Sequence, residues 1–290
     1  MDLETHTLFQ PKQANGRVAG NKYMEIPPSP LLRSYVSCYW LSEPDARQRD
    51  PSLDAFTEGC VDRVLPDGCS DFIFEHDLKR NQYRTLFCGF IDEPFTITYD
   101  QRYPLRKFGV RLFPGGIYSM LGIPQQEFAN SHVDADLVWA SMTKEIEARI
   151  FEAPSFEKKA KIMDDFLLSC IRSKRLANDN QINNLLYHIF VTEGKTSVRE
   201  LAERETMSTR HMNRIFNRWI GISPKRFCEV VRFQSIVNVI HHSSSIDSTL
   251  AFSHGYFDQA HMLRDFKRFY GDSLSVAVRE FGNRSDFYNP

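Results

Sequence analysis

Residues 197–227 read SVRELAERETMSTRHMNRIFNRWIGISPKRF, and this stretch decides the fold of the last third of the chain. Ser197 followed three positions later by Glu200 is a capping box, which predicts a helix over 197–204. A short turn at 205–207 leads to a second predicted helix over 208–220, and two helices joined in this way form a helix-turn-helix. Apolar residues recur along the second helix at intervals of three and four and form its expected buried face: Met212, Ile215, Phe216 and Trp219.

The opposite face of the 208–220 helix carries side chains that can recognise DNA bases. Arg210 and Arg214 are able to bond to guanine O6 and N7, and Asn213 to adenine N6 and N7. Phosphate contacts are expected from the residues that flank this face: Ser208, Arg218 and Lys225. The same pattern also fits the solvated face of an ordinary amphipathic helix, so the first unit by itself leaves both interpretations open.

A second unit with the same plan follows about 50 residues later. Residues 248–254 predict a short helix, residues 255–256 a turn, and residues 258–270 a second reading helix. A long helix predicted over 224–241 joins the two units. This spacer would set the reading helices to fit successive major grooves about 34 Å apart.

The outer face of the second reading helix is also polar and basic. Three of its residues have the chemistry to meet base edges: Gln259, His261 and Arg264. Two more are expected to contact phosphates: Lys267 and Arg268. The repetition of the unit favours DNA binding over a merely solvated face.

These stretches resemble the AraC/XylS family of transcription regulators. The residues that carry the resemblance are those of 197–227, VVRFQSIVNVI at 230–240, and STLAFSHGYFDQAHMLRDFKRFYGDSL at 248–274, about a third of the chain. The resemblance implies base contacts by Arg210, Asn213 and Arg214 of the first reading helix. In the second reading helix it implies base contacts by Gln259, Ala260, His261, Leu263 and Arg264.

Ala260 and Leu263 can offer a base only apolar contact, such as that with a thymine methyl. Two departures from the family pattern stand out. Tyr256 replaces the usual Phe, and Leu274 replaces the usual Pro after Ser273, which predicts a less sharply started final helix. The resemblance further implies promoter DNA and RNA polymerase as partners, and activation as the outcome.

Residues 1–133 are predicted to form a β-rich, effector-sensing domain. Short runs rich in aromatic and β-branched residues alternate with turns, and they predict a small barrel or sandwich: 34–41, 71–75, 83–89, 95–99 and 107–113. The stretches VSCYW, VLPDGCSDFIF and FGVRLFPGG, beginning at Val36, Val64 and Phe108, resemble an effector or dimerisation domain of some family members.

The middle of the chain changes to a helical pattern. Two amphipathic helices are predicted over 137–151 and 156–171, and we interpret residues 134–171 as a segment that forms a homodimer. Polar residues 172–180 read as a linker to the helical domain at 181–290. The predicted fold class is α+β in two domains, with an N-terminal β-rich barrel or sandwich with helices, and an all-α C-terminal domain holding the two helix-turn-helix units.

A candidate effector site lies at Arg102, Tyr103 and Arg106, on an expected connection between two strands. An Arg-x-x-x-Arg motif is similar to the arginine motif of PilZ domains, which bind cyclic di-GMP, because guanidinium groups can stack on guanine and bond to phosphates. The second PilZ motif is missing, and two solvated arginines remain the alternative interpretation. The motif therefore suggests cyclic di-GMP as the effector.

Composition narrows the remaining classes. Residues 1–180 contain 22 Lys and Arg against 26 Asp and Glu, whereas residues 181–290 contain 14 against 11, too small a basic excess for a non-specific nucleoid protein. The first 180 residues contain only His6, His76 and His132, far apart, so we expect no enzyme, metal or cofactor. Without a signal peptide or an apolar run of membrane length, a cytoplasmic location without membrane contact is expected.

The six cysteines show no paired spacing and are interpreted as reduced thiols. A thiol redox sensor or a metal site at these cysteines stays open, because Cys60 and Cys69 lie close together in a turn-rich stretch. The leading hypothesis is an effector-controlled transcription regulator that binds a specific DNA sequence. The alternative is a regulator of the same family that needs no ligand or that responds to thiol oxidation.

Overall fold

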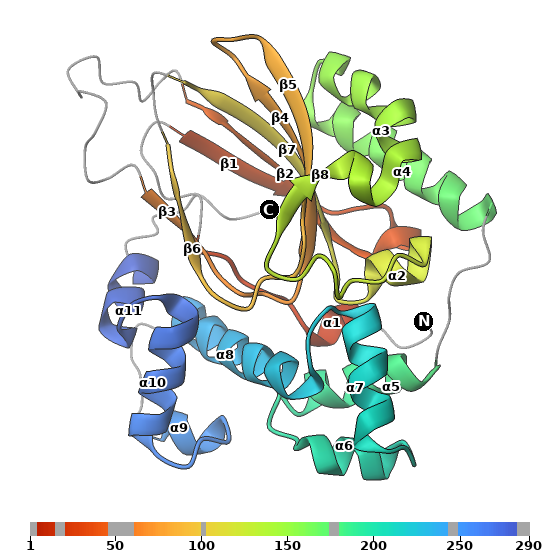
Figure 1. Ribbon diagram of the computed structural model, residues 1–290. Helices are drawn as coiled ribbons and strands as arrows, with labels where there is room; N and C mark the ends of the chain where they lie inside the picture. The colour runs from red at the N-terminus through yellow and green to blue at the C-terminus, as the bar shows by residue number, and fades with distance from the viewer. Residues whose placement is uncertain are drawn as a thin grey trace.

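An antiparallel sheet with helices on one face lies above a group of helices (Figure 1). This computed structural model describes residues 5–14, 21–45, 61–99, 103–173, 180–242 and 249–282. The main sheet has six strands in the order β1-β2-β7-β4-β5-β8. Their bounds are β1 Asn21–Ile26, β2 Val36–Pro44, β4 Ser70–Asp77, β5 Gln82–Cys88, β7 Leu105–Leu112 and β8 His132–Asp134.

A second, two-stranded sheet pairs β3 (Val61–Val64) with β6 (Phe95–Thr98). In the described part of the chain the six-stranded sheet is open, with β1 and β8 at its edges. The predicted α+β class is therefore confirmed, but the sheet does not close into a barrel. Five of these strands were predicted, and β1, β3 and β8 were missed because their sequences are short or lack a clear apolar alternation.

Alternation along the central strand β7 explains why helices cover one face of the sheet. Phe108, Val110 and Leu112 are buried with α3 and α4 in one core cluster, because alternate side chains of a strand share a face. α3 spans Ala135–Glu152 and α4 spans Phe156–Ser173, with the short α2 (Gly116–Leu121) beside them. The apolar faces of α3 and α4 are thus used against the sheet, and their role in dimerisation stays a prediction.

The helical part contains the elements that the sequence predicts. They are α5 (Asn180–Val191), α6 (Val198–Arg204), α7 (Thr209–Trp219), α8 (Pro224–His242), α9 (Leu250–Ser253), α10 (Gln259–Tyr270) and α11 (Leu274–Gly282). α11 begins at Leu274 although the family's usual Pro is absent there. Most of the predicted linker, residues 174–179, and the predicted start of α9 at residues 243–248 lie outside the described residues.

The first described segment of the chain belongs to the core of the helical part. α1 (Thr5–Leu8) lies beside α5, and the Phe9 ring stacks on Phe190 with centroids 4.6 Å apart. Ala14 is fully buried in the same cluster. Leu65, Phe90 and Tyr118 also lie in this cluster, so an apolar interface attaches the helical part to the N-terminal part.

Candidate nucleic-acid interface

Side-chain caps fix where each reading helix begins. The Ser197 hydroxyl accepts a hydrogen bond from the Glu200 backbone, and the Glu200 carboxylate accepts one from the Ser197 N–H at 2.8 Å, which confirms the predicted capping box of α6. Ser208 caps α7 by accepting from the N–H of His211. Asp258 caps α10 in the same way, at 2.6 Å from the N–H of His261. The caps of the two reading helices thus come from short side chains at Ser208 and Asp258.

The first reading helix, α7, buries its predicted apolar face and exposes its arginines. Arg210 and Arg214 are exposed, and Asn213 is half-buried. The Arg214 guanidinium donates to His211 Nδ1 at 2.9 Å, and the Asn213 amide donates to the Thr209 carbonyl at 2.8 Å. Asn213 therefore has to leave its own helix backbone before its amide can bond to adenine.

In the second reading helix, α10, four predicted base-contacting residues are exposed: Gln259, Ala260, Leu263 and Arg264. The fifth, His261, is half-buried, because its ring packs edge-on against Tyr256 and lies 3.6 Å from an oxygen of Asp265. These contacts hold His261 against the unit itself, so it is less accessible than its neighbours.

The five predicted phosphate contacts differ in how free they are. Arg268 is bonded to Glu229 at 3.0 Å and lies 3.4 Å from Asp265, so a phosphate would have to compete with two carboxylates. Arg218 lies over the Tyr118 ring, 5.2 Å from its centroid. Ser208, Lys225 and Lys267 are exposed as well. In the described part of the chain, neither Lys225 nor Lys267 forms an ion pair.

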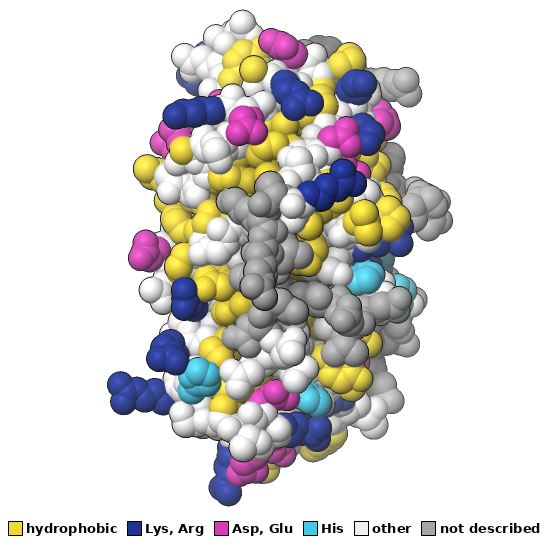
Figure 2. Space-filling model, turned by 90° about the vertical axis from the view of Figure 1, so that its right-hand side faces the viewer, with side chains coloured by type: hydrophobic (Ala, Val, Ile, Leu, Met, Phe, Trp, Pro, Cys, Tyr) yellow, Lys and Arg dark blue, Asp and Glu magenta, His cyan; other side chains and the backbone are white. Residues whose placement is uncertain are grey.

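Lys and Arg side chains are spread along the lower part of the face shown in Figure 2, with Asp and Glu among them. Residues 181–290 contain 14 Lys and Arg against 11 Asp and Glu, and this small basic excess favours binding that depends on base contacts over binding by charge alone.

Both reading helices meet the N-terminal part with their C-terminal ends. At the end of α7, Trp219 packs on Tyr118 with ring centroids 4.4 Å apart, and the Gln125 N–H donates to the Arg218 carbonyl at 2.9 Å. At the end of α10, Arg63 donates to the Tyr270 carbonyl at 2.9 Å. Figure 1 shows the two reading helices at opposite ends of α8. Because their C-terminal ends contact the N-terminal part, their N-terminal ends point away from the sheet.

A third contact joins the spacer helix α8 to the N-terminal part. Arg226 donates to Asp92 through Nε at 2.6 Å and through Nη2 to the Asp92 carbonyl at 2.8 Å. The Arg226 guanidinium also lies over the Phe269 ring of α10. Sequence reasoning missed Arg63, Asp92 and Arg226, because no local pattern links residues so far apart in the chain.

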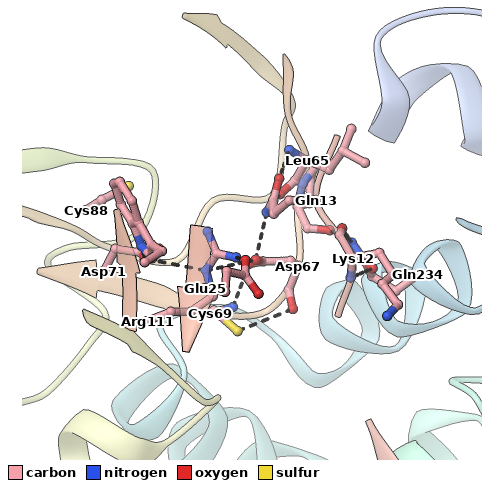
Figure 3. A network of polar contacts seen from close by, with 12 residues as sticks. Lys12, Gln13, Glu25, Leu65, Asp67, Cys69, Asp71, Cys88, Arg111 and Gln234 are labelled. Carbon is pink, nitrogen blue, oxygen red and sulfur yellow. Dashed lines mark hydrogen bonds and ion pairs between the residues drawn. The ribbon is translucent and has the colours of Figure 1, made fainter. Parts of the chain in front are cut away.

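Buried polar side chains extend this connection into the sheet (Figure 3). Gln234 of α8 bonds to both backbone groups of Lys12 and to the Pro66 carbonyl. Gln13 then donates to Asp67 at 2.7 Å, and Asp67 lies 3.7 Å from Arg111 of β7.

Arg111 is buried and surrounded by carboxylates. Besides Asp67, it lies 3.4 Å from Asp71 and 3.8 Å from Glu25. Burial raises the pKa of Asp71, with Arg111 acting in the opposite direction. Asp71 also accepts a hydrogen bond from the Trp40 indole at 2.7 Å.

The cysteines give little support to a thiol sensor. Cys38, Cys69 and Cys88 are buried, and burial raises the pKa of each thiol, which keeps it protonated and unreactive. Cys60, the other half of the suggested pair, lies outside the described residues. Within the described ranges no group of three or more His, Cys, Asp or Glu side chains is arranged to hold a metal ion.

The candidate effector residues are only partly described. Arg102 lies outside the described residues. Arg106 lies in β7 and not on a connection as predicted, because the strand already begins at Leu105. Its Nε is 3.0 Å from Glu43, and the Tyr103 ring packs under Lys79 and Arg80.

Two family models match the chain. Residues 24–134 match a domain of unknown function (DUF6597), and residues 201–280 match a helix-turn-helix domain. An uncharacterized HTH-type transcriptional regulator from Haemophilus influenzae is 34% identical over 93 residues, which is 32% of this chain. The chain covers only 31% of the length of that relative.

Solved structures of ToxT from Vibrio cholerae show a weaker likeness. ToxT from strain O395 gives a TM-score of 0.37 at 8% identity, over 74% of this chain and 90% of that one. Unsaturated fatty acid bound ToxT from strain SCE256 gives 0.38 at 10% identity, over 77% and 91%. Likeness at this level carries no argument about function. No described helix is long and apolar enough to cross a membrane.

Proposed function

Starting from a C-terminal part that is an AraC-type helix-turn-helix domain, we propose that the chain is a transcription regulator that binds a specific DNA sequence. One observation supports this most directly. α7 and α10 belong to one body, present their capped N-terminal ends away from the sheet, and expose Arg210, Arg214, Gln259 and Arg264 there. These side chains read guanine and adenine in the major groove.

We infer the binding mode from the arrangement of the two units. α8 holds α7 and α10 at its two ends, and each reading helix enters a major groove with its first turns, as in other helix-turn-helix proteins. Lys225 and Lys267 contact phosphates. Arg218 and Arg268 do so only after leaving Tyr118 and Glu229.

The test is a selection of bound duplexes from a random pool by the full chain, followed by affinity measurements on the enriched sequence. Arg214→Ala and Arg264→Ala should each lose about 1–3 kcal/mol on that sequence and relax the preference at one base pair. Arg33→Ala, which removes an exposed arginine outside the proposed dimerisation segment, is the control and should bind as the parent does. Equal losses on enriched and random DNA would show that these arginines do not read bases.

We also propose how DNA binding by this chain is controlled. We expect a small effector to bind the N-terminal domain, a homodimer to form through residues 134–171, and RNA polymerase to be recruited for activation. The contacts of Arg63, Asp92 and Gln234 support coupling between the two parts, because each joins the N-terminal part to a reading helix or to α8.

Cyclic di-GMP is the effector that the Arg102 and Arg106 motif suggests. It would have to displace Glu43 from Arg106. Calorimetry with the nucleotide at about 100 μM tests it, with thermal melting as a second readout. No heat and no melting shift would remove this effector while leaving the DNA-binding function untouched.

A further inference from the structure

Phe257 is a large apolar side chain left in solvent at the start of the second reading helix. It is 84% exposed and stands directly before the capping residue Asp258. An apolar residue at this position commonly packs against the fourth residue of the helix, here Met262. Met262 is buried in the core, and Phe257 does not join it.

The first unit provides an internal comparison. The residue before the cap Ser208 is Met207, and Met207 packs against the same core as the rest of its unit. The position is therefore able to bury an apolar side chain in this architecture. The exposure of Phe257 is a property of the second unit alone.

Phe257 continues an apolar stripe along α10. Ala260 and Leu263 lie three positions apart on α10, and both are exposed, Leu263 to 39%. Phe257 stands just before this helix, ahead of the extended capping residue Asp258. We define Phe257, Ala260 and Leu263 as the apolar stripe. The corresponding positions of the first unit are Met207, which is packed, and the polar Arg210 and Asn213.

The surroundings of the apolar stripe carry positive charge. Arg264 and Lys267 lie on the same helix and are exposed, and Arg264 contacts only the Ala260 carbonyl of its own helix among the bonds described. A partner for this face must offer apolar groups inside a negatively charged surface. The major groove of DNA does so where the C5 methyl groups of thymine project into it.

We propose that the apolar stripe reads thymine methyl groups, with Phe257 as a specificity-determining residue that extends the reading surface beyond α10 itself. The inference rests on the proposed DNA-binding function. It makes the two units unequal. The first recognises its half-site by hydrogen bonds from Arg210, Asn213 and Arg214, and the second recognises thymines through methyl contacts, with Gln259 and Arg264 beside them.

The experiment uses the full chain and the sequence enriched from a random pool. The half-site of the second unit is the one at which Arg264→Ala relaxes the base preference. Each thymine in that half-site is then replaced by deoxyuridine, which removes only the methyl group. The parent protein should bind each critical uracil duplex about three- to tenfold more weakly, since one buried methyl is worth about that factor.

Phe257→Ala should bind the thymine and uracil duplexes with equal affinity at the position that Phe257 contacts. The matched control is Phe252→Ala, which removes another exposed phenylalanine (69%) from α9 of the same unit and should keep the full discrimination. Because Phe257 is exposed, its removal should leave the melting temperature unchanged.

Three results would overturn the inference while the proposed function stands: no thymine in the second half-site, equal binding of thymine and uracil duplexes by the parent, or undiminished discrimination by Phe257→Ala. The third would show that residues other than Phe257 read the methyl groups. Failure to enrich any sequence would instead refute the proposed function, and the inference with it.

Discussion

Replacing Gln234 by Leu tests whether α8 is held to the N-terminal part by the buried polar contacts. Gln234 is 3% exposed, and its amide makes three hydrogen bonds, with Lys12 N, Lys12 O and Pro66 O at 2.8, 3.2 and 2.7 Å. A leucine side chain is similar in volume to glutamine but can form none of these three hydrogen bonds. At about 1 kcal/mol net per hydrogen bond, the loss is about 3 kcal/mol.

The buried Pro66 carbonyl is left without this donor, and Lys12 is only half-buried, so we expect a decrease of about 2–4 kcal/mol in the free energy of unfolding. Urea denaturation followed by circular dichroism measures it. Asn238→Leu is the matched control, because Asn238 lies about one turn further along α8 and is exposed. If Gln234→Leu is as stable as that control, the polar contacts do not hold the two parts together.

Two further substitutions test the buried Lys159 and the half-buried Arg63. Burial, with Arg106 nearby, lowers the pKa of Lys159 from 10.5 to about 8. Between these two pH values the unfolded chain therefore binds more protons than the folded chain. Because of this difference, the contribution of Lys159 to the free energy of unfolding rises with pH over that range. Lys159→Met should therefore be relatively more stable near pH 7, with a gain that shrinks by pH 10 in paired thermal melts; a pH-independent difference would contradict the assignment. Arg63→Met removes the donor to the Tyr270 carbonyl and should lower the free energy of unfolding by about 1.5–3 kcal/mol in urea titrations, whereas Arg199→Met on the exposed surface should change little.

The helical part was predictable because its signals are local. The pair Ser197 and Glu200, the caps at Ser208 and Asp258, and the glycines at positive φ after α7 and α10 each act within a few residues of the helix end that they define. The apolar repeat of α7 specifies its buried face in the same local way. The bounds of these helices therefore differ from the predicted ones by only a residue or two, α9 excepted.

The contacts between the two parts were not predictable for the opposite reason. Arg63 bonds to a carbonyl 207 residues away, and Arg226 to a residue 134 positions earlier, and neither has a neighbour in sequence that signals its partner. In the candidate site, too, contacts between residues far apart in the sequence could not be predicted. Residue type suggested Arg268 as a phosphate contact, but its carboxylate partner Glu229 lies 39 positions away. The spacing of apolar residues in the sequence also does not predict that Phe257 is exposed.

The anchoring of the first described segment also constrains the order of assembly during synthesis. Lys12 is bonded to a side chain 222 residues further along, and Phe9 stacks on a ring of α5. At a translation rate of about 5–20 residues per second, the segment waits roughly 10–45 s before Gln234 is made. During that interval Lys12 lacks its Gln234 partner, and for most of it Phe9 lacks the α5 ring on which it stacks. Two helices made late in synthesis, α5 and α8, thus secure Phe9 and Lys12.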